Sequence, residues 1–179
     1  MGSTVRGLLY ETNTQLDTEF ITLKTLTHGR KIVFLAYPER VFVHTKQSHF
    51  FKYIHNHVDN SIKKAHGCKN PDEVIVDEQN NIIFFIEKKF QTGPGSVCEK
   101  LQTCGYKRMH LNKIIPNYEV VYIYCLSEFF KTHCEAEIDY MRSIHVPLFW
   151  GSVKTYKNDL IDFIVNYKSE SRSQSTVGS

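Results

Sequence analysis

The strongest restriction on the fold comes from two apolar runs that flank a pair of asparagines in the stretch PDEVIVDEQNNIIFFIEKKFQ, residues 71–91. The second run, Ile82 to Ile86, is apolar at every position, as expected of a strand that a sheet buries on both faces. Asn80 and Asn81 tolerate the positive φ angles of a two-residue turn. We therefore predict a β-hairpin here, with its second strand inside a larger sheet.

Patterns on both sides of this hairpin predict an α/β fold, with a mixed central sheet and flanking helices. Before it, apolar residues at helical spacing extend through residues 46–67, with Ser48 as the expected N-cap and Gly67 as the expected stop. After it, Ser96 and Glu99 form a capping box that opens the next helix, which Gly105 interrupts. The elements predicted after the hairpin are a helix over 96–114, a strand over 118–127, a helix over 135–144, a strand over 146–150 and a helix over 158–167.

The N-terminal part has a weaker pattern. Phe20, Leu23 and Leu26 have the spacing of a short amphipathic helix within residues 16–26, and residues 31–36 resemble a strand that stops before Pro38. A chain of 179 residues suits one domain, which we place at residues 1–167 with its core at 47–127. We expect the polar tail, residues 168–179, to be disordered.

Composition excludes few classes of protein. A net charge of +3 is compatible with a polyanion partner without requiring one. There is no apolar run of a signal peptide or a membrane span, so we expect a cytoplasmic protein without membrane contact. Five cysteines without a C-x-x-C pair favour reduced thiols. A zinc site from Cys98, Cys104 and His110 is an alternative whose spacing matches no common pattern.

The charged residues at the open end of the hairpin form a possible reactive group. With a two-residue turn, Asp72 lies opposite Lys89 and Val74 lies opposite Glu87, so Asp72, Glu87 and Lys89 share one face while Lys88 points the other way. Two converging carboxylates repel each other unless a cation such as Mg²⁺ lies between them. A neighbouring lysine can hold a water and offset charge on phosphorus. The alternative is that these charges are solvated strand ends or simple ion pairs.

With these residues in view, the segment resembles the PD-(D/E)xK nuclease superfamily, in particular small type II restriction endonucleases. Pro71-Asp72 is similar to the Pro-Asp element of that family, and Glu87-Lys88-Lys89 is similar to its acid-x-lysine element. The resemblance covers residues 65–127, and it implies a restriction-endonuclease-like core made of a helix, a β-hairpin, a helix and a strand.

The resemblance also implies roles for individual residues. Asp72 and Glu87 would be Mg²⁺ ligands, with the backbone carbonyl of Lys88 as a third, and Lys89 would position the attacking water. Gln91 is similar to a residue beside the active site of related enzymes.

Many members of the family add another acid from a preceding helix. Asp59 is the acid within the helix predicted there, and the earlier residues Glu11 and Glu19 are unranked alternatives.

A basic segment follows the hairpin and is the predicted DNA contact. Ser96 opens a helix whose free amides can bind a phosphate, although an ordinary cap is an equal alternative. The basic side chains that follow suit backbone contact with DNA, and the alternative is a solvated helix face; they are Lys100, Lys107, Arg108, His110 and Lys113.

These inferences lead to an expected function. The first hypothesis is a Mg²⁺-dependent type II restriction endonuclease that cuts duplex DNA to leave 5′-phosphate ends. It would act as a homodimer, because two strands need two active sites, and with a cognate DNA methyltransferase in the same system. The alternatives are a structure-specific or repair nuclease of the same fold and a non-catalytic DNA-binding protein.

Overall fold

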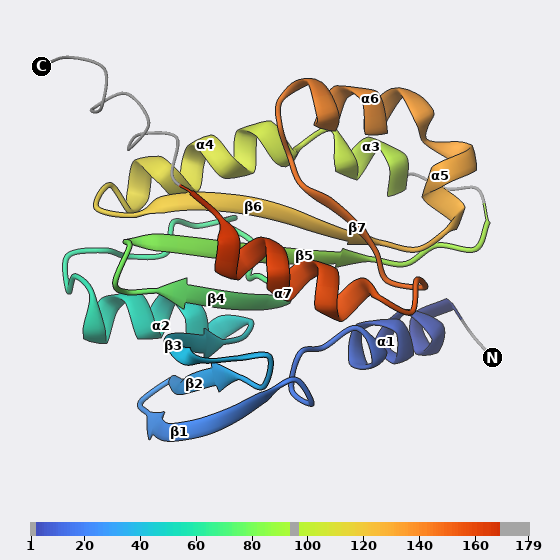
Figure 1. Cartoon of the computed structure of the whole chain (residues 1–179). Helices are drawn as coiled ribbons and strands as arrows, with labels where there is room; N and C mark the ends of the chain where they lie inside the picture. The colour runs from blue at the N-terminus through green and yellow to red at the C-terminus, as the bar shows by residue number, and fades with distance from the viewer. Residues whose placement is uncertain (1–2, 94–96, 169–179) are drawn as a thin grey trace, which may run out of the picture.

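A seven-stranded mixed sheet forms the centre of the computed structural model, which describes residues 3–93 and 97–168 (Figure 1). The strands lie side by side in their sequence order, and neighbours from β1 to β5 are antiparallel, whereas β5, β6 and β7 are parallel. Their bounds are β1 Phe20–Leu26, β2 Gly29–Phe34, β3 Tyr37–Thr45, β4 Glu73–Asp77, β5 Ile82–Lys89, β6 Glu119–Leu126 and β7 Leu148–Trp150. The predicted α/β fold with a mixed central sheet is confirmed.

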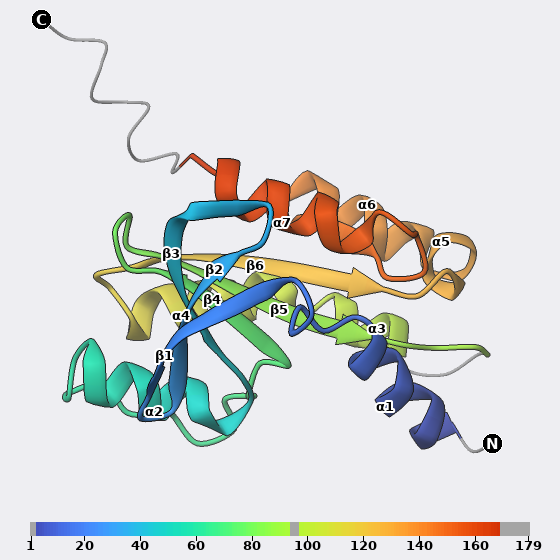
Figure 2. The same ribbon diagram turned by 60° about the horizontal axis from the view of Figure 1, so that its bottom comes forward.

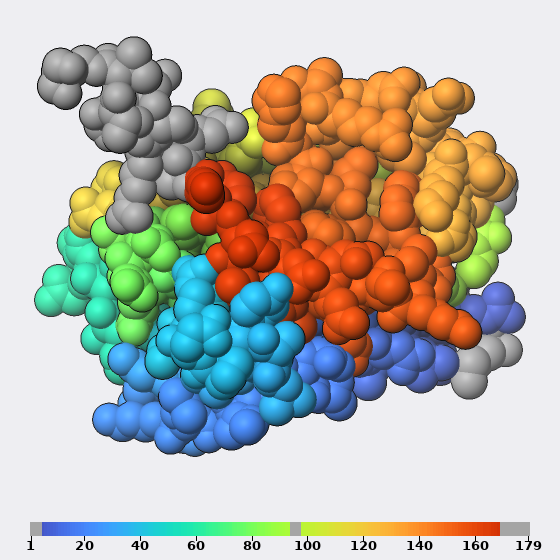
Figure 3. Space-filling model, viewed as in Figure 1, coloured from blue at the N-terminus to red at the C-terminus, as the bar shows by residue number. Residues whose placement is uncertain are grey.

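Helices cover both faces of this sheet (Figures 1 and 2). One apolar core lies between one face of the sheet and the five helices from α2 through α6. A second core lies between the other face and α7, beside α1. Figure 3 shows α7 packed over that second face, between α6 and strands β1 to β3. The helices are α1 Ser3–Asn13, α2 Ser48–His57, α3 Val97–Leu101, α4 Cys104–Ile114, α5 Phe129–His133, α6 Glu135–Ser143 and α7 Tyr156–Asn166. Within the described ranges, none of them has the length and apolar character that crossing a membrane requires.

The element order from α2 onward agrees with the sequence prediction except for the short helix α5, which was not predicted, and for differences at the helix ends. The predicted helix over 96–114 forms as two helices, α3 and α4, which break at 102–103. α2 begins at Ser48 itself, so Gln47 rather than Ser48 is the capping residue, and α2 ends at His57, ten residues before Gly67. The predicted capping residue Ser96 lies outside the described residues.

The predicted N-terminal helix over 16–26 is wrong, because Phe20–Leu26 forms the edge strand β1. Phe20 is buried, whereas Leu23 is 55% exposed, so the three apolar side chains do not form one buried helical stripe. β1 is held by its antiparallel pairing with β2, a tertiary contact that outweighs the weak helical spacing. The predicted strand near residues 31–36 is present as β2.

The hairpin is present, but its turn is longer than predicted. Asp77 pairs with Ile82, so residues 78–81 form the turn, and Asn81 has a φ of 55°. The Asp77 carboxylate accepts a hydrogen bond from the Asn80 backbone N–H at 3.0 Å, which stabilises this four-residue turn. Two extra turn residues shift the pairing by two positions. The side-chain faces are therefore kept, although the predicted partners are wrong.

The structure also corrects the expectation of reduced thiols. Cys98 in α3 and Cys134, between α5 and α6, form a disulfide, while Cys68, Cys104 and Cys125 are free. A disulfide sulfur cannot serve as a thiolate ligand, so the alternative zinc site that used Cys98 is also wrong.

Candidate active site

The open end of the hairpin faces a cavity of about 670 Å³ on the side of the sheet that carries α4. The structure brings Asp72, Glu87 and Lys89 together in its lining. Asp72 directly precedes β4, and Glu87 and Lys89 lie two positions apart at the end of β5, so alternation of side chains gives them one face. Within this cavity Glu87 is buried, with 5% of its surface exposed.

Glu87 is at the centre of the contacts in this group. Its Oε1 atom lies 2.5 Å from Lys89 Nζ and 3.5 Å from Lys107 Nζ. Its Oε2 atom is buried and accepts no hydrogen bond of normal geometry from the described residues, although the Tyr122 hydroxyl lies near enough for Glu87 to add to the effect of burial, which raises the pKa of Tyr122. A buried carboxylate oxygen without a partner is costly, and a bound cation would supply the missing contact. Lys107 comes from α4, so a residue predicted to contact DNA lies beside Glu87 in the cavity lining.

The surroundings of Asp72 favour its protonated form. Burial and then the charge of Glu87 raise the pKa of Asp72 to about 6, although the Lys88 backbone N–H and Lys89 partly offset them. The charge of Glu11, on α1, adds to this rise. The Lys88 N–H donates to Asp72 Oδ2 at 2.6 Å. Two converging carboxylates repel each other unless a cation lies between them.

Among the acids considered as additional ligands, Glu11 is the one whose charge contributes to the raised pKa of Asp72, but it does not line the cavity. Glu19 hydrogen-bonds Thr18 and Lys157 instead. Asp59 lies beyond the end of α2 rather than within it, and its Oδ1 atom accepts from the backbone N–H and the hydroxyl of Ser61 at 2.8 and 2.6 Å. Asp59 does not line the cavity, so its predicted placement in a helix beside the site is wrong.

The raised pKa of Asp72 predicts a specific dependence of stability on pH. Because the folded protein holds this proton more tightly than the unfolded chain, ionisation of Asp72 destabilises the metal-free fold as pH rises from about 4 through about 6. In EDTA at pH 8, Asp72→Asn is expected to stabilise the protein by roughly 2 kcal/mol in urea unfolding, and the gain should vanish near pH 4. Asp59→Asn, at an exposed carboxylate whose pKa is lowered, is the control that should give no gain. Equal stability of Asp72→Asn and wild type at pH 8 would contradict this prediction.

On the opposite face of the same two strands, a second charged group is fully buried. Lys88 Nζ lies 2.8 Å from Glu73 Oε2, and His44 Nε2 lies 2.8 Å from Glu73 Oε1. The Leu16 N–H also donates to Glu73 Oε1, at 3.2 Å. Burial opposes ionisation of Glu73, but the hydrogen bond from His44 and the charge of Lys88 outweigh it and lower its pKa. The prediction that Lys88 points away from the reactive face is confirmed.

Other residues selected from the sequence have different positions. Gln91 supports the chain after β5, since its N–H donates to Ser127 Oγ at 3.1 Å and its Nε2 donates to the Gly93 carbonyl at 2.7 Å. Lys100 lines the cavity. Arg108 donates to the Ile144 carbonyl at 2.9 Å and lines a separate, smaller cavity. Lys113 is exposed and lines neither cavity. Ser96, the predicted phosphate contact, lies outside the described residues.

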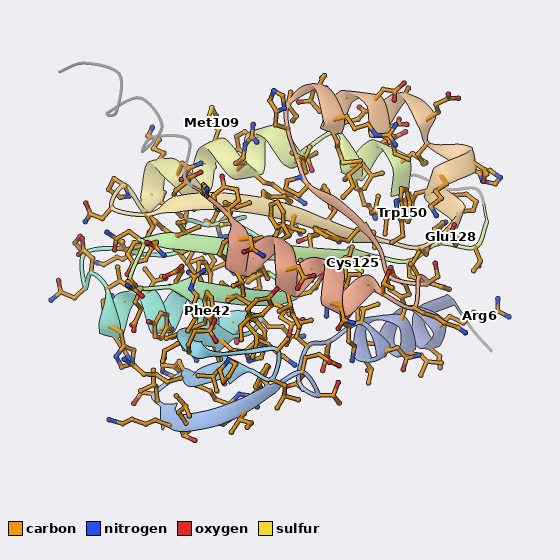
Figure 4. All side chains as sticks on the ribbon, viewed as in Figure 1. Arg6, Phe42, Met109, Cys125, Glu128 and Trp150 are labelled. Atoms are coloured by element: carbon orange, nitrogen blue, oxygen red, sulfur yellow. A yellow bond between two sulfur atoms is a disulfide. The ribbon has the colours of Figure 1, made fainter. Side chains whose placement is uncertain are left out.

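Sequence reasoning missed one wall of the cavity. The loop after α2 contributes His66, Lys69 and Asn70, and α4 contributes Tyr106. The run of basic residues in KKAHGCKN, 63–70, was the available signal for this loop. Nothing in the helical spacing indicated that Tyr106 would border a cavity. Trp150 is half-buried against the apolar core that includes α2 to α6 (Figure 4). Lys131 Nζ lies 4.6 Å from the centroid of its ring.

The residues present fit a hard divalent cation with few protein ligands. Among the described residues, no three His, Cys, Asp or Glu side chains gather into a group that would hold a metal ion. Asp72 and Glu87 supply two carboxylates, and Mg²⁺ in such sites keeps several waters and shares a phosphate oxygen. The unpartnered Oε2 atom of Glu87 is consistent with this kind of incomplete coordination.

Comparison of the chain with protein-family models, with curated proteins and with solved structures gives no match.

Proposed function

We propose that this protein is a Mg²⁺-dependent DNA endonuclease of the PD-(D/E)xK type, with its active site in the cavity at the open end of the β4–β5 hairpin. The observation that carries the proposal is the convergence of Asp72, Glu87 and Lys89 on one cavity, with Glu87 Oε2 buried and unpartnered. The order α2, β4, β5, α3, α4 and β6 supports the proposal, because the family resemblance implies a helix, a β-hairpin, a helix and a strand, and α3 and α4 stand where one helix was predicted.

In this proposal Asp72, Glu87 and the backbone carbonyl of Lys88 hold the metal ion. The bound ion would polarise the scissile phosphate and lower the pKa of a coordinated water. Lys89 orients the attacking water and offsets negative charge at phosphorus. The water oxygen forms the new bond to phosphorus and releases one proton to solvent, the bond from phosphorus to the 3′ oxygen breaks, and the 3′ oxygen takes up a proton from solvent. The products carry a 5′-phosphate and a 3′-hydroxyl.

The charges around the cavity support a nucleic-acid substrate. Its lining includes Lys69, Lys100 and Lys107 in addition to Lys89, and ammonium groups of this kind attract a phosphate backbone.

We infer a sequence-specific type II restriction endonuclease that cuts duplex DNA as a homodimer and that is accompanied by a methyltransferase for the same site. Sedimentation of the free protein and of its DNA complex measures the predicted two-fold assembly.

A structure-specific nuclease of the same fold is the second candidate, and one observation favours it. Glu87 lines the cavity and is only 5% exposed, so we expect that a phosphate must leave the surface of a continuous duplex to reach it. DNA with a flap, nick or junction offers such a phosphate at lower cost than an intact duplex.

The proposal is tested by incubating the protein with long unmethylated DNA in Mg²⁺ or in EDTA, alongside Glu87→Gln in Mg²⁺. Discrete fragments from wild type in Mg²⁺ alone are the expected result, and mapping of their ends gives the recognition site. A smear, or cleavage confined to flapped or nicked DNA, would favour the second candidate. Cleavage in EDTA, or equal cleavage by Glu87→Gln, would contradict the proposed mechanism. DNA that stays intact across a panel of sequences and structures would contradict both candidates.

A further inference from the structure

An exposed aromatic side chain borders the cavity at α4. Tyr106 is 65% exposed, lines the cavity, and lies almost parallel to the ring of His110, at 18° with centroids 5.9 Å apart. Residues four apart on a helix lie on the same side, so His110 supports one face of the Tyr106 ring. An aromatic ring that is held in this way loses little conformational freedom when a flat ligand stacks on its free face.

The surroundings of Tyr106 match the chemistry of a nucleotide. Lys100 of α3 and Lys107 of α4 line the cavity, and Lys69 lines it from the loop after α2. Aromatic side chains beside a lysine-lined groove are the pattern by which proteins hold single-stranded nucleic acid, with the base on the ring and the phosphate near the ammonium groups. A peptide or lipid ligand would not need both an exposed aromatic ring and neighbouring ammonium groups.

The size and depth of the cavity limit what can enter it. Its volume of about 670 Å³ lies within the range of roughly 300–1,000 Å³ typical of small-molecule sites, which is the scale of a nucleotide rather than a duplex. Phe85 and Tyr122 form an apolar part of the lining next to buried Glu87. If a phosphate approaches Glu87, its attached nucleotide therefore enters a cavity that has no room for the complementary nucleotide, and its base is unpaired.

We propose that Tyr106, supported by His110, stacks on one unpaired base of the DNA next to the phosphate that is cut. This inference rests on the proposed function for its substrate and adds that the nucleotide at the site is extrahelical. The unpaired base comes either from a single-stranded segment of the substrate or from a duplex out of which the protein draws it, as enzymes that flip bases do.

The test is a set of DNA affinities measured in EDTA, where the metal-dependent step is absent. Fluorescence anisotropy gives the Kd of wild type, Tyr106→Phe and Tyr106→Ala for a flapped oligonucleotide and for the matching continuous duplex. Each DNA is also made with an abasic nucleotide at one position at a time. Met109→Ala is the matched control, because Met109 is 62% exposed on α4, does not line the cavity, and points away from the sheet (Figure 4).

Tyr106→Ala is expected to weaken binding roughly tenfold, the size of one base-stacking contact, whereas Tyr106→Phe and Met109→Ala keep the wild-type affinity. At one position, loss of the base should weaken binding by wild type but not by Tyr106→Ala, which identifies the stacked base. If this dependence of the base effect on Tyr106, which we call coupling, occurs in the flapped DNA alone, the unpaired base comes from a pre-existing single strand. If it also occurs in the duplex, the protein draws the base out.

The inference is overturned if no position in either DNA couples to Tyr106, or if Tyr106→Ala binds as tightly as wild type. Because these affinities are measured without metal, they are independent of the cleavage assay. Coupling without any Mg²⁺-dependent cleavage would leave a DNA-stacking site and remove the proposed nuclease.

Discussion

Lys89→Met is expected to reduce the rate of Mg²⁺-dependent DNA cleavage by about 10²–10³-fold, the usual loss when one group that stabilises transition-state charge is removed. Methionine keeps the apolar stem of the side chain and removes only the ammonium group. The fold should be nearly unaffected, with a loss of about 1 kcal/mol or less in the free energy of unfolding. Lys89 is 23% exposed, and Lys107 remains 3.5 Å from Glu87.

Single-turnover cleavage measures the first effect and urea unfolding measures the second. Lys24→Met is the control, because Lys24 is exposed on β1, three strands away from β4 in the sheet. It should cut DNA as wild type does. Wild-type cleavage by Lys89→Met would show that the water is positioned by another group.

Replacement of the preceding residue, Lys88, by methionine should instead reduce the stability of the fold and not the cleavage rate of the folded protein. Lys88→Met is expected to lower the free energy of unfolding by about 3–5 kcal/mol, because it leaves the buried Glu73 carboxylate without its cation. Urea unfolding at pH 7 measures this loss as a lower midpoint with an unchanged slope. Any fall in cleavage should follow the fraction of unfolded protein.

A double variant separates the cost of an unpaired charge from the cost of lost packing. Glu73→Gln together with Lys88→Met removes both charges, and the glutamine oxygen can still accept from the Leu16 N–H. It should recover much of the stability that Lys88→Met loses, because replacing a whole buried ion pair is far less costly than breaking it. If Lys88→Met alone matched wild type, the Glu73–Lys88 pair would contribute nothing measurable to the fold.

The hairpin and the placement of its charges were predictable because side chains alternate between the two faces of a strand, so that any even shift in the pairing keeps each residue on the same face. The sequence predicted the wrong turn length, yet the error of two positions left Asp72, Glu87 and Lys89 on one face. The same alternation puts Glu73 and Lys88 together on the other face. The sequence therefore contained the signal for the buried pair, although it was not used.

The remaining parts depend on contacts that no local pattern contains. β1 shows no alternation of buried and exposed residues, since most of its side chains are exposed, so only its pairing with β2 defines it. The approach of Lys107 to Glu87 depends on how α4 is oriented after the break at 102–103. The disulfide joins Cys98 and Cys134, which are 36 residues apart, and sequence spacing alone does not reveal such a pairing.

The order of strands in the sheet has a consequence for how the chain folds. Every strand pairs with the strand that follows it in sequence, and the β4–β5 pair closes over a turn of residues 78–81. Closing so short a loop costs little entropy, whereas the parallel β5–β6 pair must wait for the intervening helices. Asp72, Glu87 and Lys89 are therefore expected to come together early in folding. The wall formed by α4, with Tyr106 and Lys107, joins them later, so the two halves of the cavity assemble at different times.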